Sequence, residues 1–136
     1  MKTSLKEITI STKSRIQLID ITGQVEELVR NAGVTNGICL IFSLHSTTAV
    51  VINENEKGLL SDIVRKVSEE FPKGAGWSHD RIDDNADAHL ASTFIGSSRA
   101  LPIIGGGLMR GTWQSIFLLE LDGPRTRTLI VEVIGE

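Results

Sequence analysis

The residues best suited to chemistry are three histidines, which lie far apart in the sequence at His45, His79 and His89. If the fold brings their imidazoles together, they could bind a divalent metal and leave one position open for water or substrate. Imidazole ligands favour zinc, whereas reactions of phosphates more often use magnesium. Each histidine could also be an ordinary surface or core residue. His45 is the least ordinary, because it ends an apolar run in which an unpaired imidazole is costly to desolvate.

Two arginines near the end of the chain form a second candidate group. Arg125 and Arg127 are two residues apart in a predicted strand, so their side chains project from the same face. Their guanidinium groups could bind a phosphate or carboxylate, although structural ion pairs are the alternative. Ser46 and Thr47 directly follow His45 and offer hydroxyl groups to the same ligand.

Single polar residues at the ends of predicted elements complete the candidate set. Glu54 directly follows a β-branched segment and could act as a general base, and His45 is the other candidate for proton transfer. Asn85 lies four residues before His89, so the two share a helix face. Asn85 could orient a substrate from that face, or it could cap the helix. Gln114 lies in a predicted strand and could line a pocket.

The composition is that of one globular domain. The chain has 136 residues, of which 40% are hydrophobic and 23% charged, and this length can bury a core without disulfides or metals. The single cysteine, Cys39, excludes an intrachain disulfide. A net charge of −3, with two Trp, four Phe and no Tyr, disfavours nucleic-acid binding. Neither a signal peptide nor a membrane span is predicted, so we expect a cytoplasmic protein without a membrane partner.

The elements that must position these residues are of both types. Helical periodicity predicts helices over residues 21–32, 57–71 and from 84 or 85 to 95. Apolar and β-branched runs predict strands over residues 4–12, 37–45, 48–53, 100–104, 112–121 and 125–134. The run 37–45 (GICLIFSLH) is apolar almost throughout, which predicts a strand buried on both faces. Because the strands cluster in hairpins, a single α+β domain over residues 1–136 with a largely antiparallel sheet is expected.

Several separate motifs together resemble the YjbQ-like family of uncharacterised proteins. The first motif is His45-Ser46-Thr47-Thr48-Ala49, followed by Asn53-Glu54-Asn55. The second is Asn85-Ala86-Asp87-Ala88-His89-Leu90. The third runs through Pro102-Ile103 and Gly111-Thr112-Trp113-Gln114 to Asp122-Gly123-Pro124-Arg125-Thr126-Arg127. The motifs occur in order over nearly the whole chain, which makes the resemblance specific.

The resemblance implies a fold, an assembly and an activity. The implied fold is α+β, with an antiparallel sheet curved into a half-barrel and helices packed on it, and the implied assembly is a homotrimer. The family's acidic and basic motif residues fall on Glu54, Arg125 and Arg127, and its histidine positions fall on the three histidines of this chain. The implied side activity is of the thiamine-phosphate synthase type, a transfer that joins a pyrimidine pyrophosphate to a thiazole phosphate and releases pyrophosphate.

Taken together, the candidates predict a small metal-assisted enzyme that acts on a phosphorylated small molecule. In this hypothesis the histidines hold a divalent cation, Arg125 and Arg127 hold the phosphate, and Glu54 or a metal-bound water transfers protons. Two alternatives stay open. One is a non-catalytic protein that binds a metal or an anionic metabolite, and the other is an interaction protein whose trimer surface is functional. Substrate-dependent release of pyrophosphate separates the enzyme from the binding protein.

Overall fold

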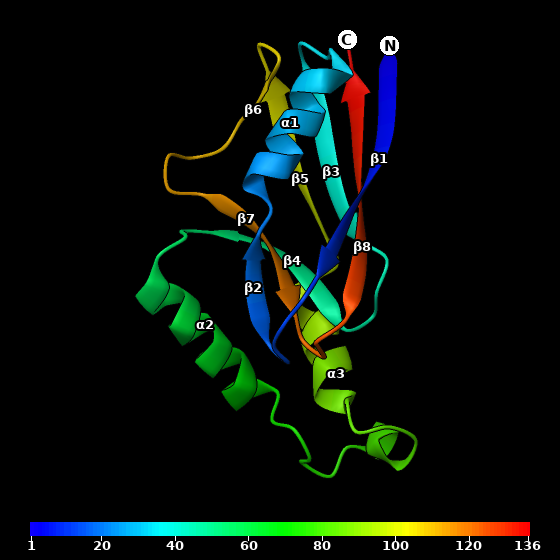
Figure 1. Cartoon of the computed structure of the whole chain (residues 1–136), viewed down its shortest axis with the longest axis vertical. Coiled ribbons are helices and arrows are strands. Elements are labelled where there is room, and N and C mark those ends of the chain that lie inside the picture. Colours follow the sequence, from blue (N-terminus) through cyan, green and yellow to red (C-terminus); the bar gives the residue numbers. More distant parts are fainter.

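Two antiparallel sheets form the scaffold of the chain, which a computed structural model describes over residues 1–136 (Figure 1). The larger sheet contains, in spatial order, β1 (Lys2–Ser11), β8 (Thr126–Gly135), β3 (Gly37–Ser43), β5 (Ser98–Ile104) and β6 (Gly107–Leu108). The smaller sheet contains β2 (Gln17–Asp20), β7 (Ser115–Glu120) and β4 (Thr48–Asn53). The larger sheet curls into a half-barrel, which confirms the expected α+β fold.

The helices are α1 (Thr22–Ala32), α2 (Lys57–Glu70) and α3 (Ala86–Ile95), with a 3₁₀ helix η1 (Ser78–Arg81) before α3. Gly33 directly follows the predicted helix 21–32 and ends α1 in the left-handed conformation, with φ of 68°. α2 ends at Glu70, one residue before the predicted end and two before Pro72. None of these helices has the length and apolar character needed to cross a membrane.

The core lies between the inner face of the larger sheet, the smaller sheet and α1. Val25 and Val29 of α1 belong to the same apolar cluster as Leu118 of β7 and Val131 of β8. A second, smaller cluster joins α3 to the smaller sheet, mainly through small alanine side chains on α3. This packing brings the end of β3, the start of β4, the end of β7 and the start of β8 to one place beside the first turn of α3.

β3 departs from its predicted environment, because only one of its faces is buried. Cys39 and Ile41 point into the core, whereas Ile38 and Phe42 on the other face are 52% and 38% exposed. Within the single chain, the apolar run therefore forms a strand that is buried on one face only. The apolar side chains on this second side of the larger sheet are together called the outer sheet face and are Leu5, Ile38, Leu40, Phe42, Ala100, Pro102, Ile104, Ile130 and Ile134. One charged side chain, Glu132, lies among them on β8, between Leu5 and Leu40.

Candidate functional site

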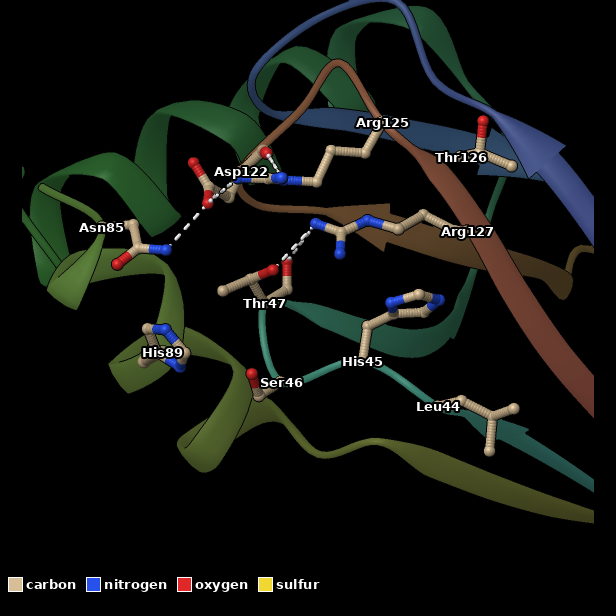
Figure 2. A pocket seen from close by; sticks show the side chains of 10 residues that line it. All are labelled: Leu44, His45, Ser46, Thr47, Asn85, His89, Asp122, Arg125, Thr126 and Arg127. Atoms are coloured by element: carbon tan, nitrogen blue, oxygen red, sulfur yellow. Dashed lines mark hydrogen bonds and ion pairs between the residues drawn. The ribbon is translucent and has the colours of Figure 1, made fainter. Parts of the chain in front are cut away.

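A polar pocket of about 660 Å³ opens where the four strand ends meet α3 (Figure 2). Its walls come from three segments that are distant in the sequence: the connection from β3 to β4, the start of α3, and the connection from β7 to β8. The lining residues are Leu44, His45, Ser46, Thr47, Asn85, His89, Asp122, Arg125, Thr126 and Arg127. The pocket thus collects six of the residues that the sequence singles out for ligand binding or catalysis, together with His89.

Arg127 forms the base of the pocket and is held by a buried carboxylate. Its Nε and Nη2 donate to Glu120 at 2.8 and 2.5 Å, and Nη2 also donates to the hydroxyl of Thr47 at 2.8 Å. Both members of the ion pair are buried, with 3% of Arg127 and 0% of Glu120 exposed. The remaining nitrogen, Nη1, donates to no protein atom and faces the pocket (Figure 2). The guanidinium is therefore fixed in place with one N–H edge free for a ligand.

Glu120 is ionised although no part of it reaches solvent. Burial alone would raise the pKa of this carboxyl group. Hydrogen bonds from Arg127, from the backbone N–H of Asp122 and from the hydroxyl of Thr12 outweigh burial and lower the pKa below its usual value. The carboxylate therefore remains a negatively charged partner for Arg127 at neutral pH.

Arg125 is bound in the same manner at the mouth of the pocket. Its Nε donates to the backbone carbonyl of Asp122 at 2.8 Å, and its Nη2 donates to the carboxylate of Asp122 at 3.0 Å. Asp122 also accepts from Nδ2 of Asn85 at 2.9 Å. Burial raises the pKa of Asp122, but the bonds from Asn85 and Arg125 outweigh it and lower this pKa overall. Nη1 of Arg125 is not used in these bonds, so the same pocket is lined by a second arginine with a free N–H edge.

His45 is fixed by β8 in a single protonation form. Its Nε2 accepts the backbone N–H of Thr128 at 2.8 Å, so this nitrogen carries the lone pair. The hydrogen-bond pattern therefore assigns the proton of the neutral ring to Nδ1. Nδ1 points toward the pocket (Figure 2). Burial lowers the pKa of His45, and the positive charge of Arg127 lowers it further, against an opposing effect of Glu120. His45 is therefore a neutral hydrogen-bond donor at pH 7.

We expect His45 to titrate below its ordinary pKa of 6.5. Protonation would place a second N–H against the amide of Thr128 and add a charge beside Arg127, so the folded state resists it. Long-range ¹H–¹⁵N NMR spectra recorded from pH 8 to pH 5 measure both the midpoint and the tautomer. A midpoint at or above 6.5, or a proton on Nε2 at pH 7, would contradict the assignment.

The structure does not bring the three histidines together. The rings of His79 and His89 meet edge to face with centroids 4.7 Å apart, but His45 directs its Nε2 toward β8. No group of three His, Cys, Asp or Glu side chains in the chain is arranged to hold a metal ion. The neutral form of His45 also lacks a free lone pair for a metal, because Nε2 is occupied and Nδ1 carries the proton. The residues of one chain thus do not fit the predicted three-histidine metal centre.

Two further sequence candidates lie away from the pocket. β4 begins beside the pocket, at Thr48. Glu54 follows the other end of this strand, about 20 Å away. Gln114 precedes β7 at the same far end, where its Oε1 accepts the backbone N–H of Gly111 at 2.7 Å. Neither Glu54, predicted as the base, nor Gln114, predicted as a pocket residue, therefore lines the polar pocket of one chain, because each lies at the end of its strand that is remote from it.

The hydrogen bonds of Asn85 bear on its two predicted roles, which are to cap α3 and to orient a substrate. Asn85 occupies the position before α3, but its side chain makes no capping bond. It donates to Asp122 instead, and its Oδ1 is buried without a hydrogen-bond partner. Ser46 is exposed at the pocket wall, whereas the hydroxyl of Thr47 is bound to Arg127. Asn85 thus orders the pocket by holding Asp122.

Sequence reasoning missed Glu120 and Asp122, the carboxylates that fix the two arginines. A detectable signal existed for Glu120, because a lone carboxylate in the apolar strand Ser115–Glu120 requires a buried partner. Asp122 lies three residues before Arg125, a spacing that allows a local ion pair. The alternatives weighed for the arginines, ion pairing or anion binding, are both compatible with the geometry, because each guanidinium has one paired edge and one free edge.

Comparison with known proteins shows close relatives along the whole chain. The family model described as UPF0047 protein YjbQ-like matches residues 6–136. A UPF0047 protein of Archaeoglobus fulgidus is 48% identical over 94% of this chain and 99% of its own length. UPF0047 protein YugU of Bacillus subtilis is 37% identical over 96% of this chain and 99% of its own length.

Solved structures of similar proteins have the same fold. The crystal structure of a YbjQ-like protein of unknown function from Sulfolobus solfataricus is 51% identical, with a TM-score of 0.98 and 99% of each chain covered. A hypothetical protein from Aeropyrum pernix is 43% identical, with a TM-score of 0.95 and coverage of 98% of this chain and 99% of its own. The likeness therefore extends from sequence motifs to the complete backbone.

Proposed function

The chain belongs to the UPF0047 protein YjbQ-like family, and from the geometry of its pocket we propose that it binds and acts on a phosphorylated small molecule. The observation that supports this proposal is the pair of free Nη1 groups of Arg125 and Arg127 in one pocket. The other edge of each guanidinium is bound to a carboxylate, that of Asp122 for Arg125 and that of Glu120 for Arg127. The Nδ1–H of His45 and the hydroxyl of Ser46 add donors on the same pocket wall. Convergent donors of this kind suit the oxygens of a phosphate or pyrophosphate.

The reaction class that suits these groups is a transfer in which phosphate or pyrophosphate leaves. Fixed N–H donors stabilise the negative charge that develops on the leaving oxygens. Neutral His45 contributes through its Nδ1–H as a hydrogen-bond donor, because loss of that proton would create an unfavourable imidazolate. A thiamine-phosphate synthase-type reaction belongs to this class. No step is derived through zinc, because the residues of one chain do not form the predicted three-histidine site.

A second candidate function is a protein that binds an anionic metabolite without turnover. The position of Glu54 favours it, since the residue predicted as the base lies outside the pocket. Incubation with pyrophosphate-bearing substrates, followed by measurement of released pyrophosphate, distinguishes the two functions. Release that is lost in Arg125→Gln supports the enzyme, whereas saturable binding without release supports the metabolite-binding protein.

Phosphate binding gives the direct test of the proposed site. We expect Arg125→Gln to weaken binding of inorganic pyrophosphate by roughly tenfold or more in isothermal titration calorimetry, because a charged hydrogen bond is lost. Arg125 is half exposed and should be replaceable without unfolding. Arg65→Gln is the matched control, since Arg65 is an exposed arginine of α2 that pairs only with Glu69. Equal affinity in Arg125→Gln and the wild type would argue against the site.

We further propose that the outer sheet face joins copies of this chain into a homotrimer. Leu5, Ile38 and Ile104 on this face are each more than half exposed in the single chain. A group of exposed large apolar side chains on one sheet face, here around the single carboxylate of Glu132, is typical of a protein interface. Leu44 extends the face to the edge of the pocket, so the assembly would lie next to the ligand site.

Assembly through this face has a measurable consequence. We expect wild-type protein to show three times the chain mass of 14.8 kDa in light scattering, and Ile38→Glu to run as a monomer. A buried glutamate without a partner is costly, which makes the substituted interface unfavourable. Ile82→Glu is the control, because Ile82 is exposed but lies outside the face. A wild-type monomer, or a trimer that survives Ile38→Glu, would exclude this interface.

A further inference from the structure

A second pocket of about 360 Å³ lies next to the polar pocket and differs from it in character. Three of its six lining residues are hydrophobic, and the other three are two imidazoles and a short serine side chain. The lining residues are Trp77, Ser78, His79, Ala86, His89 and Leu90. This pocket therefore offers an apolar, largely aromatic surface rather than a set of charges.

His89 is the wall that the two pockets share. Asn85 and His89 lie four residues apart on α3 and line the polar pocket. Ala86 and Leu90 also lie four residues apart, and they line the apolar pocket together with His89. The two pockets are thus adjacent along one helix, and a ligand that extends past His89 would enter both.

The walls of the apolar pocket are oriented by contacts within the chain. The indole Nε1 of Trp77 donates to the carbonyl of Pro72 at 2.9 Å, which fixes the plane of the ring. His79 meets His89 with an interplanar angle of 76°. Ala86 is nearly fully buried and leaves room where a larger side chain would fill the pocket. Aromatic walls in defined orientations favour a flat ring, through stacking and edge contacts.

We propose that this pocket binds the aromatic ring of the same ligand whose phosphate group occupies the polar pocket. This inference rests on the proposed function, since the phosphate site supplies the anchor next to His89. The ligand class is an aryl phosphate, in which one end requires N–H donors and the other requires apolar contact. Phenyl phosphate is the simplest probe of this class, and inorganic phosphate is the same probe without the ring.

Fluorescence of Trp77 reports occupancy of the ring site directly. The chain has two tryptophans, so Trp113→Phe leaves Trp77 as the single reporter. We expect phenyl phosphate to bind at least about tenfold more tightly than inorganic phosphate, because the ring leaves water. We also expect phenyl phosphate, and not inorganic phosphate, to change the emission of Trp77.

Two variants at the ring site test the placement. Leu90→Asn should remove the advantage of phenyl phosphate and leave the affinity for inorganic phosphate unchanged. Ser78→Phe fills the pocket from the exposed 3₁₀ helix and should have the same effect, so the test survives if one variant fails to fold. Phe94→Asn is the control, because Phe94 lies on the same helix, is 76% exposed and lines neither pocket.

The outcomes separate the ring site from the phosphate site. Binding of inorganic phosphate that depends on Arg125, with no advantage for phenyl phosphate, overturns the ring site alone. An advantage that persists in both Leu90→Asn and Ser78→Phe also overturns it, because the ring then binds elsewhere. If neither probe binds, the ring site and the proposed function fail together.

Discussion

Replacement of Glu120 by alanine is expected to lower the free energy of unfolding by about 3–5 kcal/mol, because it leaves the buried charge of Arg127 unpaired. The same change removes the acceptor for the hydroxyl of Thr12. Urea denaturation at pH 7 measures the loss. Glu69→Ala is the control, since Glu69 pairs with Arg65 on the exposed surface of α2 and should change stability little. A loss below about 1 kcal/mol would mean that water or a rearrangement compensates Arg127.

The stabilisation by Glu120 also depends on pH in a defined direction. The pKa of this carboxyl group is lowered in the folded chain, below the ordinary value of 4.5. The unfolded chain therefore binds the proton more readily than the folded chain as the pH falls. The contribution is complete above pH 4.5 and disappears as the pH falls through the folded-state pKa. Acid denaturation curves of the wild type and Glu120→Gln should converge at low pH.

The double replacement Glu120→Met and Arg127→Met is expected to separate stability from ligand binding. Removal of both charges eliminates the unpaired guanidinium, so most of the stability lost in Glu120→Ala should return. Pyrophosphate affinity should nevertheless fall by about tenfold to one hundredfold, because the Nη1 donor of Arg127 is gone. Urea denaturation and calorimetry on the same samples measure the two effects.

Either reverse result would change the assignment of Arg127. A double variant that binds pyrophosphate like the wild type would show that Arg127 has a structural role only. A double variant as unstable as Glu120→Ala would show that methionine cannot fill the space between Thr12 and Thr47. Arg125→Gln in the wild-type background provides the comparison, since it removes a donor from the mouth of the pocket without altering the buried pair.

Most of the fold could be predicted because the elements have strong local patterns. The β-branched run predicted residues 48–53 with the observed bounds, and the apolar periodicity of residues 57–71 predicted α2 to within one residue. β2, η1 and β6 were missed, since they have only two to four residues each and are defined by pairing or turns rather than by periodicity. The predicted burial of β3 on both faces is not met within the single chain, because an apolar run does not reveal which face of a sheet the chain itself covers.

The candidate site was predicted in part, for reasons of topology. Arg125, Arg127 and His45 meet because β3 and β8 are antiparallel neighbours. The hairpin pattern did not predict this pairing, because β3 and β8 are far apart in the sequence, and β7 and β8 lie in different sheets. Glu54 and Gln114 share motifs with these residues, but sequence order does not tell which end of a strand faces a pocket. The role of His45 could not be predicted either, because it depends on an amide of β8 that is 83 residues away.

The pairing of every arginine at the pocket has a consequence for how quickly ligands arrive. Arg127 is paired with Glu120, Arg125 with Asp122, and the nearby Arg15 with Asp87, so the charges largely cancel over distance. An approaching anion therefore experiences little long-range attraction, and its association rate should depend only weakly on ionic strength. Selection occurs at contact, where the free N–H edges distinguish ligands by the geometry of their oxygens rather than by their total charge.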